Sequence, residues 1–220
     1  MKRRRILFAS GALALLAFLP LRLVLGFGDG AVSARSVEGS IWHGTLRDTA
    51  IGGQRIGDLT AGLSPLHLFL AQARIGFSGA MTGAFVRSLS GSGADIDAMT
   101  LPMGLRVGSV RLTSLALSQA HVRFRGGDCR SADGRVTVQL ESPMGARTLS
   151  GALKCSGNDL AAELLSQSAM ERLTLRFPDA GHYDATFAVR ASDADQAMRL
   201  TAAGFRETAA GHVVRIKGTM

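Results

Sequence analysis

Aromatic residues are scarce in this chain of 220 residues, which has one tryptophan, one tyrosine and ten phenylalanines. This scarcity argues against long helices packed around aromatic cores, and the 27 glycines favour many short elements joined by turns. Apolar residues nevertheless make up 46% of the chain, which excludes a disordered protein. Length and apolar content together predict one domain with a hydrophobic core of its own.

Familiar catalytic motifs are also missing. The chain has no G-x-S-x-G nucleophile elbow, no phosphate-binding loop with its lysine and no H-E-x-x-H zinc motif. Asp95 and Asp97 place two carboxylates on one face of a predicted strand, where we expect both to be solvated. The histidines stand far apart in the sequence, at His43, His67, His121, His182 and His212. We therefore predict no enzyme activity, no catalytic, cofactor-binding or metal-binding residue, and no cofactor.

Acidic residues are absent from the first 28 positions, which hold five of the 25 basic residues. The remaining chain has 20 basic and 17 acidic residues, a net charge of +3 that is ordinary for a protein surface. Because the excess charge is concentrated at the N-terminus, the overall charge of +8 does not predict binding to nucleic acid.

The N-terminal basic cluster is followed by an apolar run from Ile6 to Leu25, interrupted only by Arg22. Its 20 residues are about the number that crosses the core of a bilayer. A positive cluster before such a run leaves the N-terminus in the cytoplasm and the rest of the chain beyond the membrane. We predict an inner-membrane anchor, Ile6 to Leu25, within segment 1–27, and a periplasmic domain over 28–220. The alternative is a signal peptide cleaved after Ala34.

Only two cysteines are present, Cys129 and Cys155. In an oxidising compartment an isolated pair forms a disulfide, whereas in a reducing cytosol it would be two buried thiols. The predicted export favours the disulfide. By closing a loop in the unfolded chain, this bond would stabilise the folded protein by about 3–4 kcal/mol.

Beyond residue 30 the hydropathy pattern repeats every second residue, which predicts strands with one wet face. The clearest alternation covers 135–140, 172–177, 185–190 and 213–217. Between Val107 and Arg125 the phase of the alternation changes twice, which requires a turn or a bulge at each change. Turns rich in Gly, Ser and Asp at intervals of about ten residues are typical of an antiparallel meander. We expect such turns at 52–53, 90–93, 126–128, 132–134 and 156–158.

Helical signals are few. Ser64 before Pro65 has the order of an N-cap and a first helical residue, which predicts one short helix over 64–71. For 159–170 a helix and a strand both fit, and we expect a strand because its neighbours alternate. Trp42, the only tryptophan, is expected to anchor the core where strands meet.

The predicted fold class is mainly β: a single N-terminal transmembrane helix, then a curled antiparallel β-sheet domain with one short helix. A two-layer sandwich would show the same alternation and remains the alternative.

Several short elements, taken in order, resemble the type II secretion system protein N family. They are the anchor, Gly39-Ser-Ile-Trp42-x-Gly44, Leu63-x-Pro65-Leu66, Ser131-Ala-Asp-Gly134 after the first cysteine, and Leu149-Ser-Gly-Ala-Leu-Lys-Cys155. The likeness extends from the N-terminus to about Val189. It implies a non-enzymatic accessory component of the inner membrane whose periplasmic β domain contacts other secretion subunits.

A different class of function also fits the residues. A long sheet that curls without closing would form a groove, and a groove lined by Leu, Val and Ala would accept acyl chains. The alternative function is therefore a periplasmic module that binds or transfers lipid.

Overall fold

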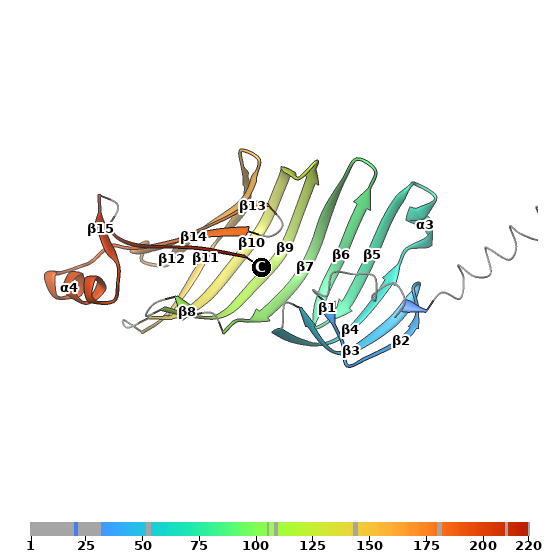
Figure 1. Cartoon of the computed structure of the whole chain (residues 1–220), viewed down its shortest axis with the longest axis horizontal. Coiled ribbons are helices and arrows are strands. Elements are labelled where there is room, and N and C mark those ends of the chain that lie inside the picture. The colour runs from blue at the N-terminus through green and yellow to red at the C-terminus, as the bar shows by residue number, and fades with distance from the viewer. Residues whose placement is uncertain are drawn as a thin grey trace, which may run out of the picture. The chain divides into compact units, whose positions relative to one another are not determined.

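The computed structural model describes residues 20–21, 32–51, 54–104, 106–107, 110–142, 145–179, 182–209 and 211–219. These residues form antiparallel strands and two helices, grouped into two compact units (Figure 1). Unit 1 extends to Leu89, and unit 2 begins at Ser90. The prediction of a mainly β, antiparallel fold is confirmed, whereas the predicted boundary at residue 28 lies outside the described residues.

Unit 1 is a small sheet with one helical turn. Its elements are β1 (Val32–Ser33), β2 (Ser36–Ser40), β3 (His43–Ile51), β4 (Gln54–Leu63), α3 (Pro65–Leu68), β5 (Gln72–Gly79) and β6 (Met81–Ser88). The strand order is β1-β3-β4-β5-β6, and β2 pairs with the first half of β3. Leu46, Leu59, Phe77 and Met81 are buried in this unit. Phe77 packs on Phe85 with 5.0 Å between the ring centroids.

Unit 2 is a longer meander. Its elements are β7 (Gly91–Pro102), β8 (Arg106–Val107), β9 (Val110–Arg125), β10 (Asp128–Ser142), β11 (Gly145–Ser156), β12 (Asp159–Ser166), β13 (Glu171–Asp179), β14 (His182–Val189), α4 (Ala194–Ala202), β15 (Arg206–Thr208) and β16 (Gly211–Thr219). The order is β7-β9-β10-β11-β12-β13-β14-β16-β15, with β8 beside β9. No ladder between described residues joins β7 to β15, so the sheet is not closed.

The core of unit 2 lies on one face of this sheet. Val138, Leu149 and Leu164 are completely buried there. Val138 lies opposite Leu149 in the β10–β11 ladder, and Leu164 lies opposite Leu173 in the β12–β13 ladder. The period of two in the sequence therefore corresponds to one buried and one wet face, as antiparallel sheets commonly have.

The two predicted phase changes between Val107 and Arg125 occur as bulges within the single long strand β9. Between Leu112 and Ser114, β9 has one residue more than its partner β10. Between Ser118 and His121, a second shift includes Gln119, whose φ is +49°. Each bulge reverses which residues of the alternating pattern face the core. β9 therefore keeps its apolar side chains on the buried face although the phase of the pattern changes along the strand.

The predicted short helix is present as α3, but Ser64 does not cap it through a backbone hydrogen bond. Its hydroxyl lies 2.8 Å from Nδ1 of His67 instead. A second helix, α4, was not predicted. Asp193 caps α4 by accepting a hydrogen bond from the Gln196 amide at 2.7 Å. The expectation of one helix in the β domain was therefore wrong, although the Asp193-x-x-Gln196 spacing is a known start signal.

Three further expectations have clear outcomes. Residues 159–166 form β12, which confirms the strand over the helix. The turn expected at 132–134 lies inside β10, where Gly134 with a φ of +121° forms part of a bulge. Trp42 occupies the β2–β3 turn and is only half-buried, while Ile41 beside it is 7% exposed and joins the core.

Among the described residues, neither helix has the length and apolar character needed to cross a membrane. The predicted span from Ile6 to Leu25 lies outside the described residues, apart from Pro20 and Leu21. Pro20 forms an isolated antiparallel bridge with Ser40, and Leu21 is 8% exposed.

Candidate interaction surfaces

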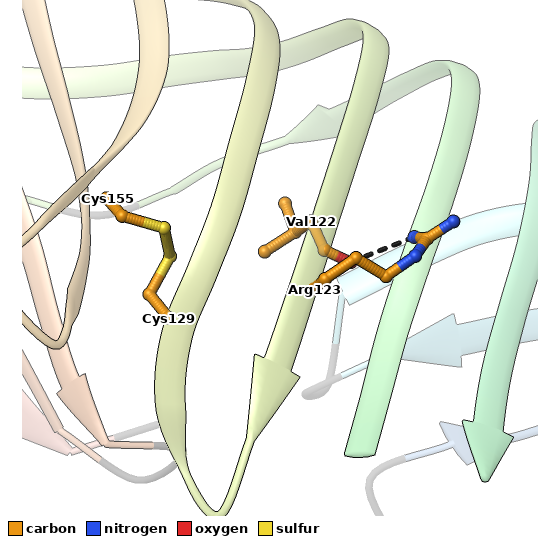
Figure 2. Close-up of a disulfide and its surroundings, with 4 residues drawn as sticks. All are labelled: Val122, Arg123, Cys129 and Cys155. Carbon is orange, nitrogen blue, oxygen red and sulfur yellow. Dashed lines mark hydrogen bonds between the residues drawn. A yellow bond between two sulfur atoms is a disulfide. The ribbon is translucent and has the colours of Figure 1, made fainter. Parts of the chain in front are cut away.

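The two cysteines form a disulfide in unit 2 (Figure 2). Cys129 lies near the start of β10 and Cys155 near the end of β11, with 5.6 Å between their Cα atoms. The ladder between these strands ends at Arg135 and Ala152, so the disulfide joins them beyond their last paired residues. The side chain of Arg123 in Figure 2 belongs to β9 and donates to the Val122 carbonyl at 3.0 Å.

A polar hollow of about 530 Å³ lies between the start of β11, the β12–β13 turn and the segment leading into α4. Its floor is the carboxylate of Glu171, whose side chain is 7% exposed. Oε1 of Glu171 lies 3.1 Å from Nε of Arg147. Its Oε2 accepts hydrogen bonds from the hydroxyls of Ser166 and Ser168.

The protonation of Glu171 follows from these contacts. Burial raises the pKa of its carboxyl, but the hydrogen bonds from Ser166, Arg147 and Ser168 and the charge of Arg147 lower it more. The resulting pKa lies below the ordinary value of 4.5, so Glu171 is a carboxylate at neutral pH. Lowering the pKa of a carboxyl makes its carboxylate a weaker general base. The arrangement therefore fits a structural ion pair better than a catalytic group.

The residues predicted from sequence do not assemble into one site within the described chain. Among these residues no group of three or more His, Cys, Asp or Glu side chains could hold a metal ion. His67 lies in α3, His212 is buried in β16, and His182 contacts Asp179 at 2.8 Å.

The solvation expected for both carboxylates of β7 holds for only one of them. Asp97 is exposed. Asp95 is paired: its Oδ1 lies 2.6 Å from NH2 of Arg123 and 3.1 Å from Nδ1 of His121. Both partners lie on β9: His121 is opposite Asp95 in the β7–β9 ladder, and Arg123 is opposite Gly93, on the diagonal two residues along. Strand pairing therefore brings together residues that are distant in sequence.

Strand β16 presents a backbone edge. It pairs with β14 from His212 to Thr219, but β15 covers only Gly211 to Val213 on its other side. In the part of the chain that the structure describes, the outer edge of 214–219 has no strand partner. Exposed Arg215 and Lys217 alternate along it with half-buried Val214 and Ile216. We call residues 214–219 the β16 edge.

The second surface is apolar and belongs to unit 1. It comprises the side chains of α3, of the turn after it and of the residue after β6, and we call it the α3 surface. Its members and their exposed fractions are Leu66 at 71%, Leu68 at 40%, Phe69 at 88%, Leu70 at 67% and Leu89 at 98%. Nearby Ile75 and Phe85, opposite each other on β5 and β6, are 41% and 47% exposed. Such clustering of exposed apolar residues marks a binding surface.

Sequence reasoning did not single out the Glu171 hollow, the β16 edge or the α3 surface as sites. One feature of the sequence could have indicated the hollow: Glu171 stands at a position where the alternating pattern calls for an apolar residue. Leu173 and Leu175 have the same parity as Glu171, so the pattern places its carboxylate on the core face. The run Leu66-His-Leu-Phe-Leu70 was visible as part of a helix, but its exposure depends on tertiary packing.

Within the described residues, the free β16 edge of unit 2 and the exposed apolar α3 surface of unit 1 have the features of surfaces that bind other macromolecules. The chain belongs to the type II secretion system (T2SS) protein N family, which it matches over residues 30–214. The resemblance seen in the sequence is thereby confirmed, and membership makes this protein a component of secretion machinery with other secretion subunits as its implied partners. Searches of curated proteins and of solved structures found no match.

Proposed function

We propose that this protein is a non-enzymatic accessory component of a type II secretion system. It is anchored in the inner membrane by its N-terminal segment and presents its β units to other subunits in the periplasm. The observation that carries the proposal is the family match over residues 30–214. The basic cluster before the apolar run supports the orientation, with the N-terminus in the cytoplasm.

Retention of the N-terminal segment is favoured over its cleavage. Cleavage after Ala34 would remove β1, whose Val32 and Ser33 pair with Ile51 and Ala50 of β3. It would also remove Leu21, which is 8% exposed. A segment that contributes a buried side chain and a paired strand stabilises the folded unit, which supports an uncleaved anchor.

The disulfide between Cys129 and Cys155 supports the compartment. Structural disulfides persist in the periplasm and are rare in the reducing cytosol. Cys129 is 4% exposed, so its sulfur is part of the packed interior and the bond closes a loop of a folded unit.

The β16 edge is our proposed contact with another subunit. A free edge offers backbone N–H and C=O groups to an added strand, which is a common way to bind a peptide segment. Arg215 and Lys217 would oppose the pairing of two copies of this edge, because like charges opposite each other destabilise a ladder. The same charges would favour a partner strand that carries acidic side chains.

The lipid-binding alternative gains no support from the Glu171 hollow. Apart from Ala146 and Met170, its wall consists of charged residues and of Ser, Thr and Gln, which do not suit an acyl chain. Mass spectrometry of an organic extract of the purified protein tests this alternative directly.

Site-specific photocrosslinking in the native host tests the proposed contact. A photoreactive residue replaces Arg215 on the β16 edge. The matched control replaces Arg176, which is also exposed but lies on β13, paired on both sides. We expect a covalent adduct with a secretion subunit from position 215 and none from position 176.

A C-terminal alkaline phosphatase fusion tests the compartment, since the reporter is active only outside the cytosol. An inactive reporter would refute the periplasmic placement. Normal export of secreted proteins by a deletion strain, together with no adduct at position 215, would refute the accessory role.

A further inference from the structure

We propose that the α3 surface inserts into the interfacial layer of the bilayer in which the N-terminal segment is anchored. The proposal rests on the membrane location proposed above and adds a second contact between unit 1 and the lipid. Three observations carry it: the exposure of the α3 surface, the place where the N-terminal run enters unit 1, and the distribution of charge.

The α3 surface lies at one end of the unit 1 sheet. α3 joins the end of β4 to the start of β5, as Figure 1 shows. Ser64 donates its amide to the Arg74 carbonyl at 2.8 Å, which closes this connection. β6 returns to the same end, because Ser88 lies opposite Gln72, and Leu89 follows it. The exposed leucines and Phe69 therefore project from a single end of the sheet.

The N-terminal segment enters unit 1 at this same end. Pro20 bridges Ser40, the last residue of β2. Ile41, in the turn that follows, accepts a hydrogen bond at 2.8 Å from the amide of Leu63, the last residue of β4. Because adjacent strands are about 4.8 Å apart, the five spacings from Pro20 through β2 to the far strand β6 amount to roughly 24 Å across the sheet.

The side chain of Leu21 fixes this entry point. A Cβ added to Gly44 would collide with Cδ2 of Leu21, so the leucine occupies space that only a glycine leaves open. The pattern Gly39-Ser-Ile-Trp42-x-Gly44 thus has a physical role, which is to seat the end of the N-terminal run on the β2–β3 hairpin.

The contact of the N-terminal run with unit 1 brings this unit close to the bilayer. Pro20 and Leu21 belong to the predicted anchor in sequence, yet they contact the β2–β3 hairpin. No linker in the sequence therefore separates the anchor from the end of unit 1 that carries the α3 surface.

The charge of this region fits an anionic bilayer. No Asp or Glu occurs from Leu59 to Ala94, whereas Arg74 and Arg87 lie on the strands next to the α3 surface. Glu38 of β2, the acidic residue nearest in sequence to Ser40, lies 4.0 Å from Arg47. An apolar surface flanked by arginines and free of acidic residues is the composition that binds membrane interfaces.

Fluorescence of a single tryptophan in the full chain tests the insertion. In a Trp42→Phe background, Phe69→Trp places the probe on the α3 surface. The control is Ala80→Trp, in the exposed β5–β6 turn at the other end of the sheet, about 25 Å away along β5. Each protein is reconstituted into vesicles of phosphatidylethanolamine and phosphatidylglycerol, with or without lipids brominated near the head group.

An interfacial element lies about 5–10 Å deep, so we expect brominated lipid to reduce the emission of Phe69→Trp roughly twofold and to leave Ala80→Trp nearly unchanged. If both proteins float with the vesicles and are quenched equally little, the insertion is refuted and the anchor stands. If the full chain does not float with the vesicles, both the anchor and the insertion are refuted. Blue-shifted emission of Phe69→Trp that depends on protein concentration and is not quenched would show that a second copy covers the α3 surface. This outcome also refutes the insertion.

Discussion

Removal of the disulfide is the most quantitative test of the structure. We predict that replacing Cys129 and Cys155 together by alanine lowers the free energy of unfolding by about 3.5 kcal/mol. The two residues are 26 positions apart, and closing a loop of that length restricts the unfolded chain by this amount in the chain-entropy estimate.

The folded state should change little on removal of the bond. β10 remains paired with β9 from Asp128 onwards, and β11 remains paired with β12 as far as Ser156. The amide of Cys129 also donates to the Asn158 carbonyl at 2.8 Å, independently of the sulfur. The loss of stability should therefore come mainly from the greater freedom of the unfolded chain.

The assay is thermal unfolding followed by circular dichroism. For a chain of this size, 3.5 kcal/mol corresponds to a fall in Tm of roughly 7–14 °C. The wild-type protein in reducing buffer should unfold at the temperature of the double variant, and the reductant should leave the variant unchanged. A fall of less than about 2 °C, with both thiols of the wild type shown to be oxidised, would refute the loop-closure reasoning.

Two further predictions concern single side chains. Glu171→Gln should cost roughly 1.5–3 kcal/mol at neutral pH, because Arg147 loses its charged partner. Folding lowers the pKa of Glu171, so its carboxylate stabilises the folded protein above pH 4.5. This stabilisation is lost as the pH falls through the lower pKa of the folded state. The free energies of unfolding of wild type and Glu171→Gln, measured in urea, should therefore converge in acid. Gly44→Ala should displace Leu21 and cost roughly 1–3 kcal/mol, seen as faster proteolysis near residue 21. The control Gly76→Ala, where an added Cβ meets no atom closer than 4.0 Å, should be neutral, and equal behaviour of the two glycine variants would contradict the packing argument.

Much of the fold could be read from the sequence, because a strand with one wet face records its orientation in every second residue. The alternation over 172–177 and 185–190 lies within β13 and within or next to β14. The slips of phase near Thr113 and Gln119 even located the bulges of β9. A bulge shifts the facing of all later residues, so it leaves a visible trace in the apolar pattern.

Other features left a weaker or misleading trace. The turn expected at 132–134 was wrong, since glycine at positive φ serves a bulge as well as a hairpin. The helix α4 was missed because its nine residues bury only Leu200 among the strands, so its apolar periodicity is short. Trp42 was placed in the core from its size, whereas the hairpin geometry puts it in a turn.

The sequence alone indicated the antiparallel β character and the family, because both depend on residue types at short or fixed spacing, whereas it favoured the cysteine pairing only through the predicted export. Only the tertiary structure decided which groups are neighbours across the sheet and which remain uncovered. Glu171 is held by Arg147, which is distant in sequence, and Leu21 rests on Gly44, because strand pairing joins residues that the chain separates. The α3 surface and the β16 edge are exposed for the same reason: exposure depends on what packs nearby, and no local pattern encodes it.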